Sequence, residues 1–172
     1  MAANLTSTES WRPMAGDDLA AVVALAARVH RDYPEEAAIF AEKLALFPRG
    51  CFVLGGAAGE IGGYGIAHPW RQGPPPALNT RLERLPAAAD TFFIHDVALA
   101  PEQRGRGAAG LLLPRLVVLA RRLHLDRCAL VAVSGSPPFW RRMGFAASPD
   151  PVLQAEVRAH YGAEAVHMTQ SI

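Results

Sequence analysis

Lysine is almost absent from this sequence. Lys43 is the only lysine among 172 residues, and arginine supplies the rest of the positive side-chain charge. This excludes most mechanisms that depend on a lysine nucleophile or Schiff base. Positive and negative charges nearly cancel, at a formal net charge of +1. The net charge therefore gives no reason to expect nucleic acid or an anionic membrane as a partner.

Cysteine and long apolar runs are also scarce. The two cysteines, Cys51 and Cys128, lie in separate apolar runs, so we expect two buried structural thiols in a reducing compartment and no metal site. No run approaches the roughly 18 apolar residues of a membrane span, and the polar residues 1–10 lack the apolar region of a signal peptide. We therefore expect a cytoplasmic protein without a membrane partner.

The chain has ample material for one hydrophobic core. Its hydrophobic content is 51%, and 172 residues suffice for one domain that buries about two-thirds of its unfolded surface. Glycine and proline, at 15 and 14 residues, stay below the share that is typical of a disordered chain. We expect a single domain over residues 1–172.

Hydrophobic periodicity and turn residues predict interleaved helices and strands. Helices are predicted over residues 19–30, 35–47, from near Gly105 to 124, 136–143 and 153–161. Strands are predicted over residues 10–14, 51–54, 61–68, 92–99, 127–133, 145–147 and 165–170, with a glycine-rich turn at 55–59. Residues 71–89 include three consecutive prolines and are expected to lack regular structure.

The most informative segment covers residues 92–109. Aromatic and β-branched residues predict a buried strand up to Leu99, and Pro101 ends it because proline has no N–H to donate. A helix then opens near Gly105. Gly105 and Gly107 let the backbone approach a ligand closely, and the unpaired N–H groups and dipole of a helix N-terminus favour an anion there. The segment therefore predicts a cradle for a pyrophosphate.

This segment resembles motif A of the GNAT superfamily, the acyl-CoA-dependent N-acyltransferases. The family signature Arg/Gln-x-x-Gly-x-Gly/Ala is matched by Arg104, Gly107 and Ala109. Residues 138–145, Pro-Phe-Trp-Arg-Arg-Met-Gly-Phe, look like the family's motif B, a short helix that leads into the next strand. The two motifs stand in the family's order, with a predicted helix and strand between them.

The resemblance covers nearly the whole chain and implies a GNAT-type α/β (α+β) fold, with a mixed, mostly antiparallel central sheet of about 6–7 strands flanked by about 4–5 helices. It implies that acetyl-CoA is the cosubstrate and that its acetyl group passes to the primary amine of a small molecule by direct attack on the thioester. By position, the backbone N–H of Val97 would polarise the thioester carbonyl and Leu99 would pair with the pantetheine arm. Residues implied to bind CoA are Val97, Leu99, Arg104, Gly105, Arg106, Gly107, Ala108, Ala109, Phe139 and Trp140.

Acetyl transfer benefits from a base, because an alkylamine with a pKa near 10 is protonated at neutral pH. His95 is the leading candidate, since an ordinary imidazole pKa near 6.5 suits proton acceptance, and its position resembles the catalytic His of arylalkylamine acetyltransferases. Asp96 is the alternative base, and a third interpretation makes His95 a buried structural residue. Because side chains alternate along a strand, His95 and Asp96 should face opposite sides of the sheet unless the strand is distorted.

Trp140 departs from the family pattern. Many relatives carry a tyrosine here that protonates the departing thiolate, whereas an indole N–H donates a hydrogen bond but does not give up its proton. A thiol with a pKa near 8.5 can also leave as thiolate and take a proton from water, and Ser134 and Ser136 are weaker substitutes. Trp140 is expected to pack against the CoA arm or the core.

The acceptor amine is expected to lie against aromatic side chains. Candidate substrate-binding residues are Tyr33, His68 and Trp70, with Phe40 and Phe47 close by in the sequence pattern. Acidic residues near them are Asp32, Glu35 and Glu36. Aromatic rings with carboxylates suit an organic cation, although core aromatics and a solvated acidic helix start would give the same pattern. With the segment 71–89 as a lid beside the acceptor, the chain looks most like the arylalkylamine acetyltransferase branch.

Two further functions are weighed against this one. A non-catalytic acyl-CoA-binding or regulatory module would keep the pyrophosphate cradle and lack the acid at Trp140. A different nucleotide-binding protein is disfavoured because no Walker lysine follows Gly107. The sequence is compatible with a monomer and with a homodimer.

Overall fold

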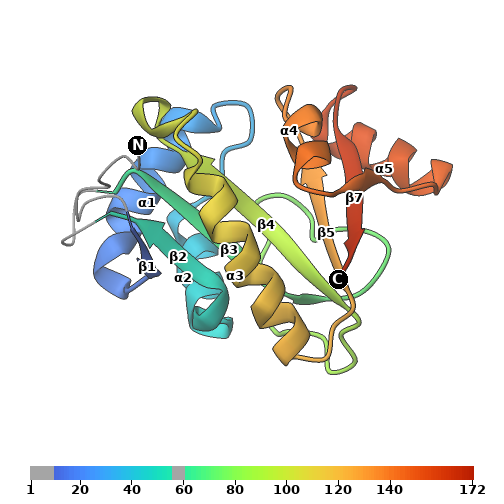
Figure 1. Cartoon of the computed structure of the whole chain (residues 1–172), viewed down its shortest axis with the longest axis horizontal. Coiled ribbons are helices and arrows are strands. Elements are labelled where there is room, and N and C mark those ends of the chain that lie inside the picture. The colour runs from blue at the N-terminus through green and yellow to red at the C-terminus, as the bar shows by residue number, and fades with distance from the viewer. Residues whose placement is uncertain (1–9, 56–60) are drawn as a thin grey trace, which may run out of the picture.

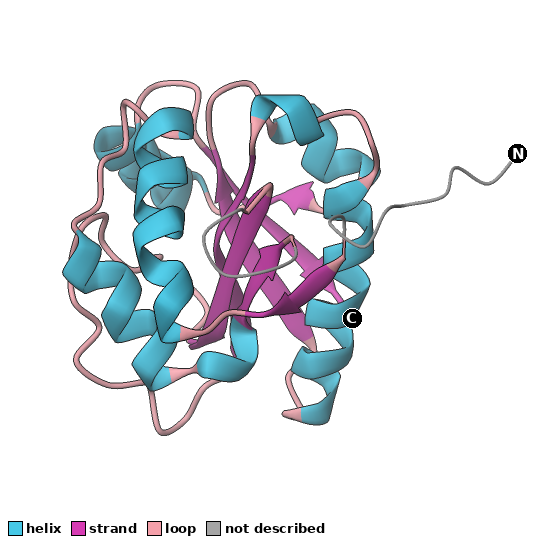
Figure 2. Ribbon diagram, turned by 90° about the vertical axis from the view of Figure 1, so that its left-hand side faces the viewer, coloured by secondary structure: helices cyan, strands magenta, loops and turns pink. Residues whose placement is uncertain are grey.

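A seven-stranded sheet organises the chain. The structure, a computed structural model, describes residues 10–55 and 61–172. Within these residues the strand order is β1-β2-β3-β4-β5-β7-β6, and five α-helices pack around the sheet (Figures 1 and 2). All neighbouring strands of the described sheet run antiparallel except β4 and β5, which are parallel.

Helices and strands are interleaved along the chain, with two α-helices in succession near its start and three strands in succession after them. The strands are β1 (Trp11–Pro13), β2 (Cys51–Leu54), β3 (Gly63–Trp70), β4 (Thr91–Leu99), β5 (Arg127–Ala132), β6 (Ala146–Ala147) and β7 (Val166–Ser171). The α-helices are α1 (Leu19–Val29), α2 (Ala37–Leu46), α3 (Ala108–Arg122), α4 (Pro137–Arg142) and α5 (Pro151–Tyr161). Short 3-10 helices are η1 (Gly16–Asp18), η2 (Pro48–Gly50) and η3 (Pro101–Gln103).

Helices cover both faces of the sheet (Figure 2). On one face, α3 buries Leu112 and Leu116 against Phe92 and Ile94 of β4. Leucines at helical spacing give α3 this apolar stripe, and burial of each side chain stabilises the fold by roughly 1.5–3 kcal/mol.

The opposite face is covered by α1 and α2. Val22 of α1 and Phe40 of α2 are almost completely buried, together with Tyr64 of β3 and Ala98 of β4. Ala98 belongs to this cluster, whereas its neighbour Leu99 packs with the α3 cluster, as the alternation of side chains along a strand requires.

The predicted fold class is confirmed, and the element boundaries differ from the predictions by a few residues. The helix predicted from near Gly105 begins at Ala108, because Gly105 and Gly107 adopt φ angles of 73° and 80° and form the preceding turn. Cys51 and Cys128 are buried free thiols, as predicted, and burial raises the pKa of each to about 12. Residues 1–9 and 56–60 lie outside the described chain, and with them most of the turn predicted at 55–59.

β4 and β5 pair only near their beginnings. Phe92 pairs with Cys128 and Phe93 with Ala129, and the described register ends there. Beyond these pairs the two strands diverge from their shared end (Figure 1). The edge of β4 that faces β5 therefore has no strand partner from Ile94 to Leu99 in the described sheet, and a cavity opens beside it.

Candidate active site

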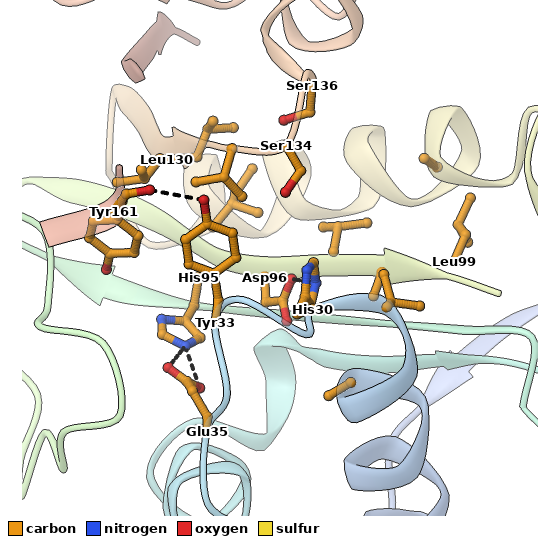
Figure 3. A pocket seen from close by; sticks show the side chains of 18 of the residues that line it. His30, Tyr33, Glu35, His95, Asp96, Leu99, Leu130, Ser134, Ser136 and Tyr161 are labelled. Carbon is orange, nitrogen blue, oxygen red and sulfur yellow. Dashed lines mark hydrogen bonds and ion pairs between the residues drawn. The ribbon is translucent and has the colours of Figure 1, made fainter. Parts of the chain in front are cut away.

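A β-bulge in β4 determines which side chains reach the cavity. Ile66 of β3 pairs with Asp96 and Ala67 pairs with Ile94, so His95 has no partner on β3 and is the extra residue. A bulge breaks the simple alternation of side chains. His95 and Asp96 consequently both line the cavity (Figure 3). Opposite sides are expected for a regular strand only. The bulge is the distortion that brings both side chains to the cavity.

His95 is paired with a carboxylate from the α1–α2 connection. Its Nε2 lies 3.1 and 3.0 Å from the two carboxylate oxygens of Glu35 (Figure 3). The side chains of His95 and Glu35 are 5% and 6% exposed. Since a carboxylate accepts, Nε2 carries the hydrogen, and Nδ1 has no hydrogen-bond partner among the described residues. This pairing leaves Nδ1 available to accept a proton.

The Glu35 carboxylate is held in its charged form. Burial opposes its ionisation, but hydrogen bonding to His95, the charge of Lys43 and a backbone N–H from Asn79 outweigh that cost and lower the pKa of Glu35 to about 2. Lys43 lies almost completely buried on α2 at 2% exposure. Burial lowers the pKa of Lys43 from its usual value, against the opposing charges of Glu35 and Glu42. The only lysine of the chain thus provides positive charge behind the Glu35–His95 pair.

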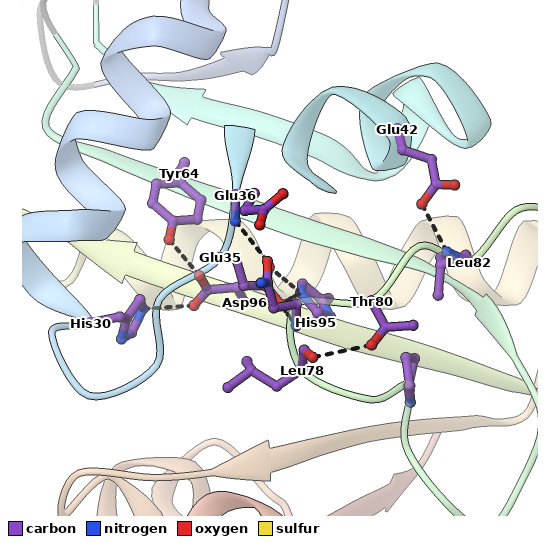
Figure 4. Close-up of polar contacts among 12 residues, drawn as sticks. His30, Glu35, Glu36, Glu42, Tyr64, Leu78, Thr80, Leu82, His95 and Asp96 are labelled. Carbon is purple, nitrogen blue, oxygen red and sulfur yellow. Dashed lines mark hydrogen bonds and ion pairs between the residues drawn. The ribbon is translucent and has the colours of Figure 1, made fainter. Parts of the chain in front are cut away.

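Asp96 forms a second polar cluster. Nε2 of His30, at the end of α1, donates to one Asp96 oxygen at 2.8 Å, and the hydroxyl of Tyr64 donates to the other (Figure 4). Burial lowers the pKa of His30, but the hydrogen bond and charge of Asp96 outweigh it, so the net pKa is raised above 6.5. Burial and the charge of Asp96 raise the pKa of Tyr64 well above its usual value. Both oxygens of Asp96 are therefore occupied by donors.

These groups border one cavity of about 550 Å³. It is bounded by α1 and the α1–α2 connection on one side, by β4 and the segment after β5 in the middle, and by α4 and the end of α5. Lining residues from β4 onwards include Phe93, Ile94, His95, Asp96, Val97, Leu99, Arg104, Gly105, Ala109, Leu130, Ser134, Ser136, Phe139, Trp140 and Tyr161. Val97 and Leu99 lie on the part of β4 whose outer edge is unpaired.

One end of the cavity is formed by the turn before α3. Arg104, Gly105 and Ala109 line it, whereas Arg106, Gly107 and Ala108 complete the turn without lining it. A Cβ atom at Gly105 or Gly107 would meet no atom within 4 Å, so space for a ligand exists there. Gly107, with a positive φ of 80°, is the residue that precedes the 15-residue helix α3. The turn thus has room for an anion, and the cradle itself stays a prediction.

Trp140 lies on α4 beside the same cavity. It is 8% exposed, and its ring packs against those of Phe139 and Phe145 with centroids 5.1 and 5.5 Å apart. Phe139 and Trp140 both line the cavity, while Phe145 belongs to the core. The indole therefore packs between the core and the cavity.

The candidate substrate-binding residues are only partly brought together. Tyr33 lines the cavity, but His68 and Trp70 do not. His68 is 2% exposed, and its Nδ1 donates to the carbonyl of Pro69 at 2.9 Å. Trp70 donates to the carbonyl of Pro74 at 3.2 Å. The structure thus does not support an aromatic acceptor surface formed by β3, because these side chains turn toward the core and the following loop.

Tyr161, and not His68 or Trp70 of β3, is the aromatic residue that lies beside Tyr33 at the cavity. Its ring lies 6.4 Å from that of Tyr33, centroid to centroid, and its carbonyl accepts a hydrogen bond from the Tyr33 hydroxyl at 2.9 Å (Figure 3). The Tyr161 hydroxyl in turn donates to the carbonyl of Pro76 at 3.0 Å. The end of α5 is therefore bonded both to the α1–α2 connection and to the β3–β4 connection.

The β3–β4 connection (residues 71–90) contains the segment 71–89 predicted as a lid, and it is bonded to α2 and to the residue that precedes α2. The side chain of Asn79 accepts from the backbone N–H of Glu36 at 2.7 Å, and Glu42 accepts from the backbone N–H groups of Leu82 and Glu83 at 2.8 and 3.0 Å (Figure 4). Leu78 of this connection lines the cavity. These contacts hold the connection against α2, next to the loop that carries Glu35.

The sequence does not predict the contacts that Glu35, His30 and Tyr161 make at the cavity. Glu35 was noted only as one of several nearby acids, and His30 and Tyr161 were not singled out. Their partners lie 60, 66 and 128 residues away in the sequence. Only the run Tyr33-Pro34-Glu35 after a predicted helix gave a signal, since polar and aromatic residues on a loop next to a core helix often serve a site.

The described residues contain neither a membrane-spanning helix nor a metal-binding cluster. Residues 10–55 and 61–172 contain no helix with the length and apolar character to cross a bilayer. The same residues contain no group of three or more His, Cys, Asp or Glu side chains arranged to hold a metal ion.

The sequence matches one family profile, and the fold resembles several solved structures. The profile of the "Acetyltransferase (GNAT) family" matches residues 18–145. No curated protein matches the sequence. Ard1 from Thermoplasma volcanium superimposes with a TM-score of 0.69 at 14% identity, over 96% of this chain and 98% of that chain.

Two of the similar solved structures, described next, contain CoA or an analogue. Naa50 from Arabidopsis thaliana, in complex with the bisubstrate analogue CoA-Ac-MVNAL, gives a TM-score of 0.67 at 12% identity over 97% of this chain and 100% of that chain. Rv2747 from Mycobacterium tuberculosis, in complex with CoA, gives 0.65 at 17% identity over 95% of this chain and 99% of that chain. At these identities the likeness establishes the fold.

Proposed function

The chain belongs to the acetyltransferase (GNAT) family, which uses acetyl-CoA, and on this premise we propose that it acetylates the primary amine of a small molecule within a single domain. The observation that carries the proposal is the buried Glu35–His95 pair with a free Nδ1 in the cavity. Direct attack of the amine on the thioester is favoured over a cysteine acyl-enzyme. Cys51 and Cys128 are buried, and a pKa of about 12 keeps each thiol protonated at neutral pH.

We assign the base to His95. Nδ1 would take the proton from the ammonium of the acceptor, and the Glu35 carboxylate would stabilise the imidazolium that forms and keep the hydrogen of the neutral ring on Nε2. Asp96 is the weaker candidate, because both of its oxygens already accept hydrogen bonds from His30 and Tyr64.

We assign the CoA moiety to the turn before α3 and to the open edge of β4. When bound, acetyl-CoA supplies a thioester whose carbonyl carbon accepts the amine. Arg104 and the turn from Gly105 to Ala109 would hold the pyrophosphate through charge and backbone N–H groups. The backbone N–H of Val97 would donate to the thioester carbonyl, and Leu99 would pair with the pantetheine arm, since this edge lacks a strand partner in the described sheet.

The contacts on the acceptor side support a small amine. Tyr33 and Tyr161 are hydrogen-bonded to each other, and residues 71–90 are bonded to α2 and α5, so these elements are joined beside the cavity of about 550 Å³. Tyr33, Phe93 and Tyr161 are aromatic, and Glu35 supplies negative charge, which together suit an arylalkylamine. An arylalkylamine is therefore our preferred acceptor.

A protein N-terminus is the second candidate. It is favoured by the likeness in fold to the NatC complex bound to Gag peptide and CoA, at a TM-score of 0.65 and 16% identity over 96% of this chain and 99% of that chain. A peptide entering between the α1–α2 connection and α5 would have to separate the Tyr33–Tyr161 hydrogen bond. The small amine needs no such opening, and for this reason we rank it first.

A thiol-release assay tests the proposal. Purified protein with acetyl-CoA is given arylalkylamines, polyamines, amino acids, aminoglycosides and peptides with free N-termini, and His95→Gln is the control. Rapid release with an arylalkylamine that is lost in the control is expected. Release only with peptides would favour the second candidate. Binding of CoA without release for any amine would identify a non-catalytic acyl-CoA-binding module.

A further inference from the structure

The cavity contains a second imidazole with a free nitrogen. His30 follows the last residue of α1, its side chain is 20% exposed, and its Nε2 lies 2.8 Å from Oδ1 of Asp96. Nδ1 of His30 has no hydrogen-bond partner among the described residues. The cavity is thus bordered by two histidines, each bound to a carboxylate through Nε2 (Figures 3 and 4).

Acetyl transfer leaves a thiolate that needs a proton, and the cavity offers few acids. Trp140 cannot release its N–H proton at useful pH, and the serine hydroxyls and Arg104 hold theirs too tightly. The hydroxyls of Tyr33 and Tyr161 already donate to backbone carbonyls. With His95 assigned as the base, His30 is the other imidazole that lines the cavity. Its Nδ1 has no acceptor in the described chain.

The charges around His30 favour its protonated form. Asp96 of β4 and Glu35 of the α1–α2 connection both raise the pKa of His30, while burial and the charge of Arg104 lower it. The phenol of Tyr64, on β3, faces the same carboxylate from the other side. The net effect is a pKa above the usual 6.5, so the imidazolium persists to higher pH than in a free histidine.

The position of His30 also fits the path of the cosubstrate. Its hydrogen-bond partner Asp96 directly precedes Val97, whose N–H we assign to the thioester carbonyl. Arg28, two residues earlier in α1, pairs with Glu102 of η3 at 3.1 Å, so the end of α1 lies beside the segment leading into the phosphate turn. The imidazole therefore lies beside Asp96, the residue next to the one whose N–H we assign to the reacting carbonyl.

We propose that His30 is the acid that protonates the sulfur of the departing CoA, an inference that rests on the proposed acetyl transfer. The amine nitrogen forms a bond to the acetyl carbon as the carbon–sulfur bond breaks. The amine proton passes to Nδ1 of His95, and the electron pair left on sulfur takes the proton from Nδ1 of His30. His30 regains a proton from water, which its partial exposure allows.

The test compares His30→Gln with wild type at saturating acetyl-CoA and amine across pH 6–10. Glutamine retains an N–H donor for Asp96 but cannot act as an acid. We expect kcat to fall about 10²-fold with little change in CoA affinity. The fall of wild-type kcat at alkaline pH should be absent from the variant. His160→Gln, an exposed histidine on α5, is the matched control and should behave as wild type.

Thermal unfolding is measured in parallel, and His30→Asn repeats the test if the glutamine variant is destabilised. A variant with kcat within twofold of wild type, or with an unchanged alkaline fall in kcat, overturns the assignment of His30 while leaving acetyl transfer intact. Absence of turnover in wild-type protein with every amine would instead overturn the proposed function and this inference together.

Discussion

The carboxylate of Glu35 and the imidazole of His95 form a hydrogen-bonded pair at 3.0 Å, although 60 residues separate them in the sequence. Glu35 comes from the loop between two helices, and His95 is the bulged residue of the central strand β4. Because both side chains are nearly inaccessible to water, at 6% and 5% exposure, solvent competes little for this bond. The pair fixes which ring nitrogen faces the cavity, and this gives the first prediction.

Glu35→Gln should lower kcat by about 10- to 100-fold and leave acetyl-CoA affinity unchanged. A neutral amide stabilises the imidazolium of His95 less than a carboxylate does, and its NH2 group favours the ring tautomer with hydrogen on Nδ1. Glu36→Gln, at the exposed neighbouring position, is the matched control and should retain full turnover. Steady-state kinetics decide the outcome. An equal loss of kcat in both variants would mean that negative charge on this loop matters and that the Glu35–His95 hydrogen bond does not.

His95→Ala should lower the rate of amine acetylation by about 10²-fold or more and remove the acidic limb of the pH–rate profile, since no group then has to lose a proton before accepting one. Calorimetry should give the same CoA affinity as wild type. Asp96→Asn is the comparison, and it should retain the acidic limb. If Asp96→Asn is inactive and His95→Ala is nearly normal, the roles of the two residues must be exchanged.

The sequence predicted the parts of this site that depend on local order. Strand β4, the glycine turn and α3 follow from neighbouring residues, and the structure contains all three. The bulge at His95 depends on pairing with β3, where one residue of β4 is left over, and no local pattern indicates it. The same limit explains Tyr161, which meets Tyr33 only because α5 packs near the α1–α2 connection. It also explains His68, whose aromatic character suggested a ligand site and whose burial makes it part of the core.

Gly107→Glu should abolish detectable CoA binding while the protein stays folded. The carboxylate would stand in the cradle and repel the pyrophosphate, and a side chain at a φ of 80° adds about 1–2 kcal/mol of backbone strain. Gly73→Glu is a matched control, because Gly73 also has a positive φ of 109° and open space but lies in the β3–β4 connection and not in the turn before α3. Calorimetry with CoA is the measurement. Equal affinity in wild type and Gly107→Glu would refute the assignment of the cradle.

His68 should make the protein less stable as the pH falls from 6.5 toward 5. Burial lowers the pKa of His68 to about 3, so in this range the unfolded chain binds a proton that the folded protein does not. The free energy of unfolding should therefore decrease by about 1.4 kcal/mol per pH unit below 6.5 from His68 alone. His167, whose pKa burial also lowers, adds to the slope with the same sign. The pKa of His30 is raised in the folded protein, so His30 is protonated in both states below pH 6.5 and adds no slope there. Its contribution to stability is lost only as the pH rises above 6.5.

His68→Phe should reduce this slope, because the phenyl ring fills a similar space beside Phe93 and does not titrate. The variant loses the hydrogen bond to Pro69, which lowers stability at pH 7.5 by about 1 kcal/mol without altering its pH dependence. Urea unfolding at several pH values measures both effects. An unchanged slope between pH 6.5 and 5 in the variant would show that His68 is not the group responsible.

Trp140 provides the last prediction, since it stands where many relatives carry an acidic phenol. The indole is 8% exposed and packs against Phe139 and Phe145. If packing is its only role, Trp140→Phe should keep turnover within several-fold of wild type, with a loss of stability from the smaller ring. Trp140→Tyr restores the phenol, but we expect no large gain, because the neighbouring side chains are packed around a larger ring and His30 already supplies a proton.

Steady-state rates at saturating acetyl-CoA for wild type and both Trp140 variants test this, with thermal unfolding and CoA calorimetry as controls. A collapse of turnover in Trp140→Phe with unchanged stability and CoA affinity would assign a catalytic hydrogen bond to the indole N–H. A large gain in Trp140→Tyr would show that thiolate protonation limits the wild-type rate and that the new phenol reaches the sulfur. In that case the wild-type acid is inefficient, and the double variant with His30→Gln should retain most of the gain, because the phenol and the imidazole would supply the same proton.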